Sequence, residues 1–280
     1  MSEVRPQVAV VTGASSGIGR ATALAFARRG VAVVAVARRE ARLREVAGAC
    51  AAEAPGSFHL AGDLGERAFA ESVVGEAGSR LGRVDVLVNN AAVPMRKLLF
   101  ETSVEEAEAS FRVNFFACLW TTFAAIPWML RQGGGTIVNV SSFASKVVPT
   151  HETLYAAAKC AMNGFSEGLW NDLRGSGIHV ALLHPGAIDT EIWEKGQAPV
   201  RFRGRKHPPE LVADAILEAV DRRVHERVVP RRQPSLVAAG LLKLVAPGLL
   251  RAGVARMDPV TPSQLEAARA RARAGKPLGG

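Results

Sequence analysis

Thr12-Gly-Ala-Ser-Ser-Gly-Ile-Gly19 is the stretch of sequence that decides the fold. It follows directly on Val8–Val11, a short apolar run typical of a buried parallel strand. After it, Ala, Leu and Phe recur at helical spacing from Arg20 to Arg29. A strand, a glycine-rich turn and a helix in this order are the context that a dinucleotide-binding fingerprint requires.

The glycines of this turn are the first candidates for binding a cofactor. They would let the backbone turn tightly and let a pyrophosphate approach the helix N-terminus, whose free N–H groups favour anions. Their spacing, G-x-x-x-G-x-G, is one residue longer in the first gap than G-x-G-x-x-G. The predicted cofactor residues of the turn are Gly13, Ser15, Ser16, Gly17, Ile18 and Gly19.

The second apolar run, Val31–Ala37, ends without the Asp or Glu that would accept hydrogen bonds from an adenosine ribose. Arg38 and Arg39 follow instead and offer a guanidinium to a 2′-phosphate. We therefore predict NADP(H) rather than NAD(H) as the cofactor. The alternative is that both arginines only begin the next helix, expected over residues 40–53.

A short strand is expected near Ser57–Ala61, followed by Asp63 and Leu64. The Asp63 carboxylate at the end of this strand could meet the adenine edge of a dinucleotide, or it could cap the helix that follows. Asp63 and Leu64 are accordingly candidate cofactor residues.

The fourth strand, Val84–Val88, ends in Asn89-Asn90-Ala91. A side-chain amide at a strand end can bond to the backbone of the neighbouring strand and hold a nucleotide crevice open. Asn89 and Asn90 are therefore interpreted first as structural support. Asn90 and Ala91 also join the predicted cofactor residues.

One long helix is expected over residues 101–131, with a kink or break near Pro127. Asn114 is a polar residue within its apolar stretch. Since a buried amide must be satisfied, Asn114 is expected to bond either to local backbone or to an active-site water.

Tyr155 and Lys159 stand four residues apart on a helix expected over residues 153–174, so they project from the same face. A phenol titrates near ~10, and a neighbouring ammonium is expected to lower its pKa. Ser142 follows a strand-like run, 136–141, and its hydroxyl could bind the oxygen atom whose proton Tyr155 gives or takes. Taken alone, the pair also fits a solvated surface contact.

The remaining pattern completes the predicted fold. A sixth strand over 178–183 precedes His184-Pro185-Gly186, and a helix over 208–222 precedes a last strand at 227–229. This alternation predicts one doubly wound parallel sheet of about seven strands with helices on both faces. The motifs fall at the carboxyl ends of strands, where such sheets bind ligands.

Composition and charge exclude several classes of protein. The hydrophobic fraction of 48% supports a buried core and argues against disorder. The net charge of +9 arises entirely after residue 200, because residues 1–200 carry 19 basic and 19 acidic side chains and residues 201–280 carry 16 and 7. A neutral body with a basic tail does not favour nucleic acid as a partner.

The three cysteines form no C-x-x-C pair, the six histidines show no metal spacing, and no secretory leader is evident. No apolar run reaches the ~18 residues of a membrane span. We therefore expect a cytoplasmic protein with no metal site and no structural disulfide.

The glycine-rich turn, Asn89-Asn-Ala91, Asn114, Ser142, Tyr155-x-x-x-Lys159 and Pro185-Gly186 together resemble the short-chain dehydrogenase/reductase family. The resemblance covers roughly residues 5–232. It implies a single-domain Rossmann-type fold and NADP(H)-dependent interconversion of a carbonyl and a secondary alcohol by hydride transfer. Arg38 stands where NADP(H)-preferring members carry a basic residue, whereas Ser16 stands where they often carry a second one.

The resemblance also implies a role for each catalytic position. Tyr155 would be the acid–base residue, and Ser142 would hydrogen-bond the substrate oxygen. Lys159 would bind the nicotinamide ribose and lower the Tyr155 pKa, and Asn114 would hold a water in a proton relay. The residues expected to border the nicotinamide are Pro185, Gly186, Ile188 and Thr190, and the segment after them would cover the substrate.

The substrate is expected to be an apolar carbonyl or alcohol compound, because apolar residues flank the catalytic positions. His151, between Ser142 and Tyr155, is expected to line the pocket. The full set of predicted lining residues is Phe143, Val147, Val148, His151, Leu154 and Trp193. The apolar members of this set could equally be ordinary core residues.

Residues 233–280 lie beyond the resemblance and are predicted to be a separate helical extension, basic and apolar. Pro247 breaks any continuous helix there. The extension could pack on its own or a partner subunit, lie on an anionic membrane surface, or cover a lipophilic substrate. A homodimer or homotetramer is expected through the helices at 101–131 and 153–174.

Two alternatives to an enzyme stay open from the sequence. One is a regulatory protein that senses NADP(H) without turnover, and the other is a membrane-surface lipid-binding protein on the same scaffold. The intact set of Asn114, Ser142, Tyr155 and Lys159 argues against the sensor, because a sensor has no need of an acid–base tyrosine.

Overall fold

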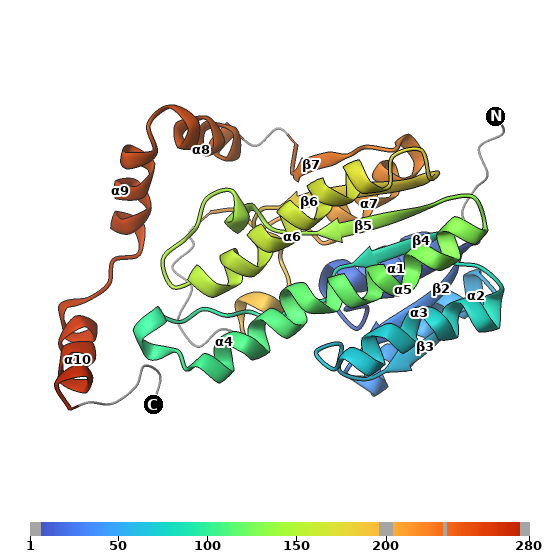
Figure 1. Cartoon of the computed structure of the whole chain (residues 1–280), viewed down its shortest axis with the longest axis horizontal. Helices are drawn as coiled ribbons and strands as arrows, with labels where there is room; N and C mark the ends of the chain where they lie inside the picture. The colour runs from blue at the N-terminus through green and yellow to red at the C-terminus, as the bar shows by residue number, and fades with distance from the viewer. Residues whose placement is uncertain (1–6, 196–203, 232–233, 275–280) are drawn as a thin grey trace.

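Seven parallel strands form the central sheet, in the order β3-β2-β1-β4-β5-β6-β7 (Figure 1). The structure is a computed structural model that describes residues 7–195, 204–231 and 234–274. The predicted doubly wound parallel sheet is confirmed. The strands are β1 (Val8–Thr12), β2 (Ala32–Ala37), β3 (Phe58–Ala61), β4 (Val86–Asn89), β5 (Gly135–Val140), β6 (Ile178–Pro185) and β7 (Glu226–Val229).

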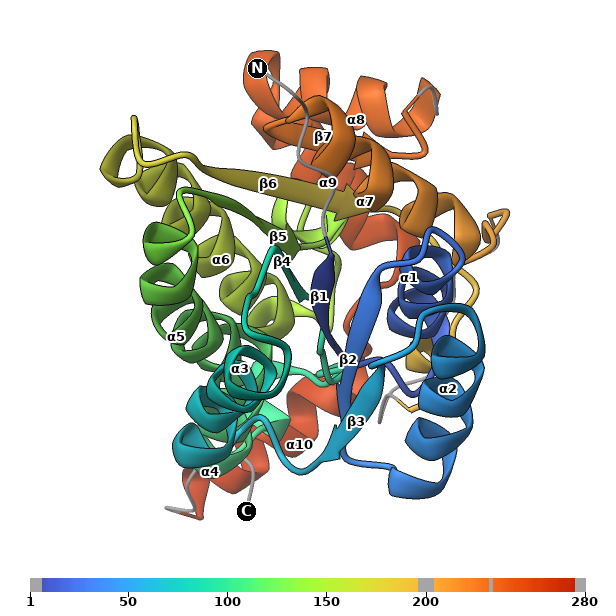
Figure 2. The ribbon, with the colours of Figure 1, turned by 90° about the vertical axis from the view of Figure 1, so that its right-hand side faces the viewer.

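Helices cover both faces of the sheet, as Figure 2 shows from one end. One face carries α1 (Gly17–Ala27), α2 (Glu40–Glu53) and α7 (Glu210–Arg222), and the other carries α3 (Arg67–Leu81), α4 (Val104–Phe111), α5 (Ala117–Arg131) and α6 (Thr153–Asp172). Because the strands are buried on both faces, their side chains divide between two apolar clusters, one on each side. Short 3-10 turns at Leu99–Glu101, Phe143–Ser145 and Glu191–Trp193 connect the elements.

The helix expected over residues 101–131 differs from the prediction in two ways. It begins at Val104 and contains a π-helical turn, Arg112–Phe116, between α4 and α5. Of the kink or break expected near Pro127, the break is wrong, because α5 continues through this residue to Arg131. The carbonyl that loses its partner to proline belongs to Phe123, whose side chain is 63% exposed, so water can reach that side of the helix.

The same stretch, Val104–Arg131, is long and apolar enough by length and composition to cross a membrane, which the sequence expectation denied. Its inner side chains, including Ala117, Ala125 and Met129, are buried with α3 and the sheet in one apolar cluster. The inner face of this helix thus belongs to the core, whereas Phe116, Phe123 and Leu130 are exposed and 39% of the apolar window is buried.

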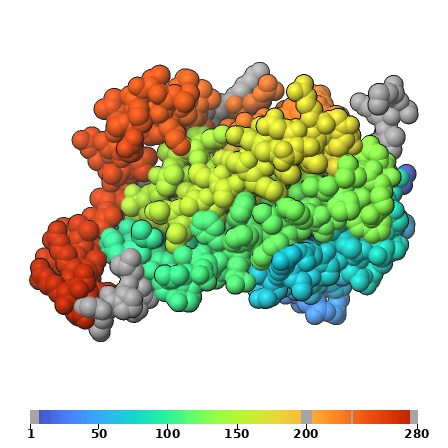
Figure 3. Space-filling model, viewed as in Figure 1, coloured from blue at the N-terminus to red at the C-terminus, as the bar shows by residue number. Residues whose placement is uncertain are grey.

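Three helices form the C-terminal extension, and each begins with a proline, a residue favoured at the first helical position. They are α8 (Pro234–Val245), α9 (Pro247–Met257) and α10 (Pro262–Arg273). Figures 1 and 3 show them along one end of the molecule. The expected break at Pro247 is confirmed. The predicted domain boundary at residues 232 and 233 lies outside the described residues.

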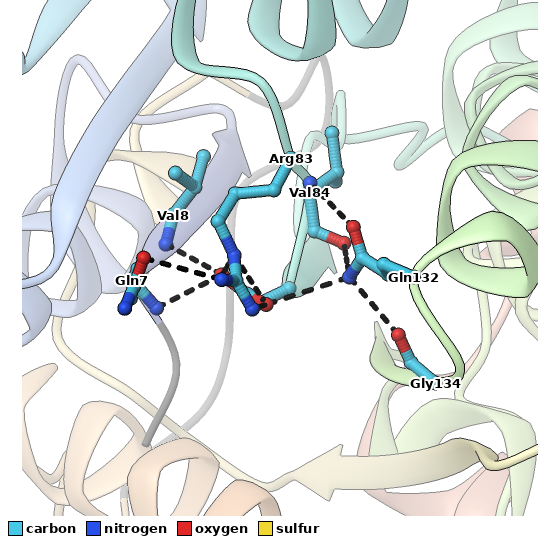
Figure 4. Close-up of polar contacts among 7 residues, drawn as sticks. Gln7, Val8, Arg83, Val84, Gln132 and Gly134 are labelled. Carbon is cyan, nitrogen blue, oxygen red and sulfur yellow. Dashed lines mark hydrogen bonds and ion pairs between the residues drawn. The ribbon is translucent and has the colours of Figure 1, made fainter. Parts of the chain in front are cut away.

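Asp85, just before β4, binds groups at the start of the sheet, and Figure 4 labels its partners Gln7, Val8, Arg83 and Gln132. Its carboxylate accepts hydrogen bonds from the backbone N–H groups of Gln7 and Val8, both at 2.9 Å, and from the guanidinium of Arg83. Gln132, after α5, donates to the same carboxylate at 3.4 Å. The side chain of Asp85 thus joins β1, β4 and the end of α5.

We expect Asp85→Ala to lower the free energy of unfolding by about 1–3 kcal/mol, because it leaves two backbone donors and a guanidinium without their acceptor. Chemical denaturation measures the change. Asp221→Ala is the matched control, since Asp221 pairs with Arg29 at the surface and is worth less than about 1 kcal/mol. Equal losses in the two variants would contradict the assignment.

Candidate active site

A cavity of about 1730 Å³ lies at the carboxyl ends of β1, β2, β4, β5 and β6. It exceeds the roughly 300–1,000 Å³ of a typical small-molecule pocket, so it has room for a cofactor and a substrate together. β1 lies between β2 and β4, the point where the strand order reverses and doubly wound sheets bind ligands. The predicted cofactor residues that line it are Gly13, Ser15, Ser16, Gly17, Ile18, Arg38, Arg39, Asp63, Leu64, Asn90, Ala91, Tyr155, Lys159, Pro185, Gly186, Ile188 and Thr190.

Thr12, the last residue of β1, ties that strand to the end of β4. Its hydroxyl donates to the carbonyl of Val88 at 3.0 Å and accepts from the N–H groups of Asn90 and Ala91 at 2.9 and 3.0 Å. The Asn90 amide donates in return to the carbonyl of Thr12 at 2.9 Å. The support expected of Asn90 is thus present as a set of hydrogen bonds between two strands.

Asn89 supports the sheet from within. Its side-chain amide donates to Asn139 on β5 at 2.9 Å and to Thr122 on α5 at 3.1 Å, and its oxygen accepts from Thr121 at 2.7 Å. All four side chains are buried. Asn89 therefore has its hydrogen-bonding capacity used inside the protein, as the structural interpretation expects.

The glycine-rich turn leaves no space for side chains at its glycines. A Cβ on Gly19 would lie 2.3 Å from the carbonyl oxygen of Gly13, and one on Gly17 would lie 2.8 Å from the Thr190 methyl. Gly17 also has a φ of +52°, which favours glycine. Gly19 packs beneath the turn and does not line the cavity, unlike the other predicted residues of the turn.

This turn fits the pyrophosphate of a dinucleotide. It opens directly into α1, and the side chain of the N-cap residue Ser16 makes no capping hydrogen bond. The N–H groups at the start of α1 therefore keep their capacity to bind an anion. Bare backbone at the glycines allows that anion to approach closely.

The two arginines after β2 have different surroundings. The Arg39 guanidinium donates to the hydroxyls of Ser15 and Ser16, at 3.1 and 2.7 Å, and pairs with Glu191 at 2.7 Å. Arg38 is exposed, and within the described parts of the chain its side chain has no hydrogen bond or ion pair. Arg38 thus has its guanidinium available at the rim of the cavity.

Glu191 is a site residue that the sequence analysis missed. It follows β6 and pairs with Arg39, Arg42 and Lys195. Hydrogen bonds from Lys195 and Arg39 lower the pKa of Glu191 to about 2, so it is ionised at neutral pH. Its neighbour Lys195, four residues on, forms an ordinary surface pair that marks no site, and its partners on α2 and at the end of β2 are about 150 residues away in sequence.

Asp63 does not cap the following helix, so that alternative is wrong. Its carboxylate accepts from the N–H of Gly65 at 2.9 Å and closes a tight turn, whereas the N-cap of α3 is Glu66. The turn places Asp63 and the buried Leu64 at the cavity. Both remain candidates to contact the adenine end of a dinucleotide.

Ser142, Tyr155 and Lys159 all line the cavity. Ser142 follows β5, acts to lower the pKa of the Tyr155 phenol, and its Oγ accepts from the N–H of Ala144 at 3.1 Å. The Lys159 ammonium lies 5.9 Å from the centre of the Tyr155 ring and donates to the carbonyl of Val140 at 2.9 Å. The three side chains therefore form one group between β5 and α6.

Burial dominates the ionisation of this group. It raises the pKa of Tyr155 to about 12, against a lowering by the Ser142 hydrogen bond. It also lowers the pKa of Lys159 to about 8. The expectation that Lys159 lowers the pKa of Tyr155 is wrong in this arrangement, because the ammonium points to the Val140 carbonyl and burial of the phenol prevails.

Asn114 is fully buried and lies behind the cavity, not in its lining. Its side-chain oxygen accepts from the N–H of Val93 at 2.9 Å, and its nitrogen donates to the Val93 carbonyl and to Ser110, both at 3.0 Å. The sequence analysis expected this amide to bond either to local backbone or to an active-site water. In the structure it bonds to the backbone of Val93. Asn114 belongs to the π-helical turn, a local distortion frequently found at functional sites.

The predicted substrate residues divide into two sets. Phe143, Val147 and Trp193 line the cavity. His151, Val148 and Leu154 do not, so their prediction as lining residues is wrong. The backbone of His151 is left-handed, with φ of 67°, and its buried imidazole lies 3.1 Å from the carboxylate of Asp258. The predicted substrate-covering segment runs into residues 196–203, outside the described part of the chain.

Three further charged residues line the cavity and were missed from the sequence. Arg96, only 8% exposed, pairs with Glu152 at 2.8 Å and with Asp258 at 2.5 Å. One feature of the sequence could have pointed to Asp258, because it is the one acidic residue between positions 231 and 260. Its partners lie more than a hundred residues earlier, so no periodicity could identify them.

Comparison with known proteins places these features in one family. The family model of short chain dehydrogenases matches residues 7–200. An uncharacterized oxidoreductase of Staphylococcus saprophyticus is 34% identical over 229 residues, covering 81% of this chain and 97% of the relative. An uncharacterized oxidoreductase of Bacillus subtilis is 32% identical over 250 residues, covering 86% and 70%.

Two solved structures share the fold. A short chain dehydrogenase/reductase from Burkholderia phymatum, in complex with NAD, aligns with a TM-score of 0.80 at 27% identity, covering 94% of this chain and 99% of the other. An alcohol dehydrogenase from the archaeon Thermococcus sibiricus, complexed with 5-hydroxy-NADP, aligns with a TM-score of 0.72 at 28% identity, covering 82% and 99%.

The single tyrosine of the chain allows its ionisation to be followed directly. Because burial raises the pKa of Tyr155 to about 12, we expect the ultraviolet absorbance of tyrosinate to stay absent through pH 10 while the chain is folded. In denaturant the same group should titrate near ~10. The folded pKa lies above the unfolded one, so the stability that this group contributes is lost as pH rises from about 10 to about 12.

Two variants complete this titration. Tyr155→Phe should abolish the signal, and Ser142→Ala should raise the pKa of Tyr155 further, because it removes the hydrogen bond that lowers it. A folded-state midpoint below 10 would contradict the geometry.

Proposed function

The chain belongs to the short-chain dehydrogenase family, and we propose that it is an NADP(H)-dependent oxidoreductase that interconverts a carbonyl and a secondary alcohol. The observation that carries the proposal is that Ser142 and Tyr155 line one cavity, with Lys159 beside the phenol ring, and that this cavity is large enough for cofactor and substrate. When bound, the nicotinamide cofactor supplies or takes up the hydride.

The proton chemistry belongs to residues of this chain. Tyr155 keeps its proton at neutral pH, so in the reducing direction it gives that proton to the substrate oxygen. Ser142 donates a hydrogen bond to the same oxygen as negative charge develops there. Lys159 is charged below about pH 8, where its pKa lies, and its ammonium lies beside the Tyr155 ring, where the nicotinamide ribose would be bound. The oxidising direction reverses each transfer.

The preference for NADP(H) is part of this proposal and rests on the residues after β2. No carboxylate stands at the end of β2, and Arg38 offers an exposed guanidinium there. Arg39 reaches over the turn to Ser16, the position where NADP(H)-preferring relatives often carry a basic residue. Since Glu191 already engages Arg39, we assign the larger share of 2′-phosphate binding to Arg38.

Three sequence predictions stay predictions alongside this function. A homodimer or homotetramer through α4, α5 and α6 is favoured by the exposed side chains of Phe123 and Leu130, 63% and 50% accessible on α5. Contact with a membrane surface is favoured by exposed Leu244 and Leu249 on the basic extension. A cytoplasmic location rests on composition alone.

Turnover tests the reaction class. We expect NADPH consumption over a panel of ketones, aldehydes and ketosteroids, followed by the absorbance of NADPH. Tyr155→Phe should lower kcat by about 10²–10⁴-fold, because it removes the proton donor, while the Kd for NADPH stays within a factor of about two. If NADPH bound tightly but neither this panel nor the matching alcohols reacted, a cofactor sensor would be the better account.

A second prediction concerns cofactor choice. Arg38→Ala should weaken NADPH binding by about tenfold or more and leave NADH binding nearly unchanged, because only NADPH carries the phosphate that a guanidinium would contact. Fluorescence titration of both cofactors gives the two Kd values. Arg44→Ala is the control, since Arg44 is an exposed residue of α2 paired with Glu40. Equal weakening of both cofactors by Arg38→Ala would refute the assignment.

A further inference from the structure

The C-terminal extension is attached to the body at separate points around the cavity. At its start, Leu236 of α8 packs on Gly186, where a Cβ would lie 3.1 Å from the leucine Cδ1. In the middle, the ammonium of Lys243 donates to the carbonyl of Lys146. At the end of α9, Asp258 accepts hydrogen bonds within the cavity wall.

These attachments follow three different strands. Gly186 follows β6, Lys146 follows β5, and Arg96, the partner of Asp258, follows β4. The helices α8 and α9 therefore pass from the β6 side of the cavity to the β4 side, at the end of the molecule where Figure 1 shows them. Because α8 and α9 are attached on both sides of the cavity opening, they cover the part of the opening between the attachments.

The inner side chains of α8 and α9 form part of the cavity that holds Ser142 and Tyr155. They recur at helical spacing, so one face of each helix is turned to the cavity. Met95, Phe143 and Trp193 of the body line the same cavity, and the lining from both parts is mainly apolar. The residues contributed by the extension are Ser235, Leu236, Ala239, Val254, Met257 and Asp258.

The end of α9 is held by a cluster of four charged or polar groups. Asp258 pairs with Arg96 at 2.5 Å and with His151 at 3.1 Å, and Arg96 also pairs with Glu152 at 2.8 Å. Arg96 and His151 are 8% and 7% exposed. Because these groups satisfy one another, they hold the extension in place, and the rest of the surface that the extension offers to a substrate is mainly apolar.

We propose that residues 234–258 are the outer wall of the substrate site, and that this wall makes the enzyme select long or multi-ring apolar carbonyl compounds over small ones. The proposal rests on the carbonyl–alcohol chemistry above and adds the substrate class. Within it, Leu236, Ala239 and Val254 determine specificity by contact. Asp258 is a positioning residue that keeps α9 against the cavity through Arg96 and His151.

Two variants of the full chain disturb the wall in opposite ways. Asp258→Ala releases α9 from Arg96, and Ala239→Trp fills the cavity from α8. Each should lower kcat/KM for a long-chain methyl ketone by about tenfold or more relative to kcat/KM for acetone, because only the long ketone reaches the wall. Leu249→Ala, a surface residue of α9 outside the cavity, is the control and should leave that ratio unchanged.

Binding and mobility are measured separately from turnover. In the Tyr155→Phe background, calorimetry should show the long-chain methyl ketone binding about tenfold more weakly when Asp258→Ala is added, and unchanged when Leu249→Ala is added. Hydrogen exchange of the α9 amides should rise in Asp258→Ala, and exchange in α5 should not, because the attachment of α9 is lost. The Kd for NADPH should stay the same in both variants.

The outcomes distinguish this inference from the proposed function. If all variants turned over ketones with the same length preference, the proposal that residues 234–258 form the outer wall would be contradicted, and the reaction class would still stand. Failure of the long ketone to bind the Tyr155→Phe chain, or unchanged exchange of α9 in Asp258→Ala, would also overturn it. Absence of turnover across the whole panel would refute the reaction class, and the calorimetric and exchange results would still decide whether the wall exists.

Discussion

The hydrogen bonds of Thr12 are the constraint on which the rest of the site depends. They join the end of β1 to the end of β4 at the point where the strand order reverses, and so fix the width of the crevice there. Asn90, held by Thr12, in turn packs on Gly13, where a Cβ would lie 2.8 Å from its amide nitrogen. The glycine-rich turn is therefore confined by β1, by β4 and by the side-chain amide of Asn90.

Burial explains the ionisation of Tyr155 and Lys159. An enclosed phenol holds its proton and an enclosed ammonium loses its proton more easily, so Tyr155 and Lys159 shift in opposite directions. The protein supplies the Lys159 ammonium with the carbonyl of Val140 and the phenol with Ser142, which keeps both polar groups satisfied within an apolar wall. The Tyr155 phenol therefore keeps its proton at neutral pH and can donate it.

The parts of the site that could be predicted from the sequence are those specified by neighbours along the chain. The glycine spacing after β1 and the four-residue spacing of Tyr155 and Lys159 depend on local geometry, and both sets line the cavity. Contacts between residues far apart in the sequence could not be predicted. Glu191 and Arg39 are 152 positions apart, and His151 and Asp258 are 107 positions apart. The break predicted at Pro127 is absent for a different reason. The side of α5 at Phe123 is exposed, so water can bond to the carbonyl that proline leaves without a helical partner.

The distance along the chain between Asp258 and its partners has a consequence for how the protein is made. Arg96, His151 and Glu152 belong to the part of the chain that leaves the ribosome first, and the sheet can assemble around them while Asp258 is still to be synthesised. Until Asp258 arrives, the Arg96 guanidinium has one carboxylate fewer and the cavity is open on the side of α9. The wall formed by α9 is thus completed late in biosynthesis, and a chain cut short before residue 258 would keep its strands and Tyr155 but lack that side of the cavity.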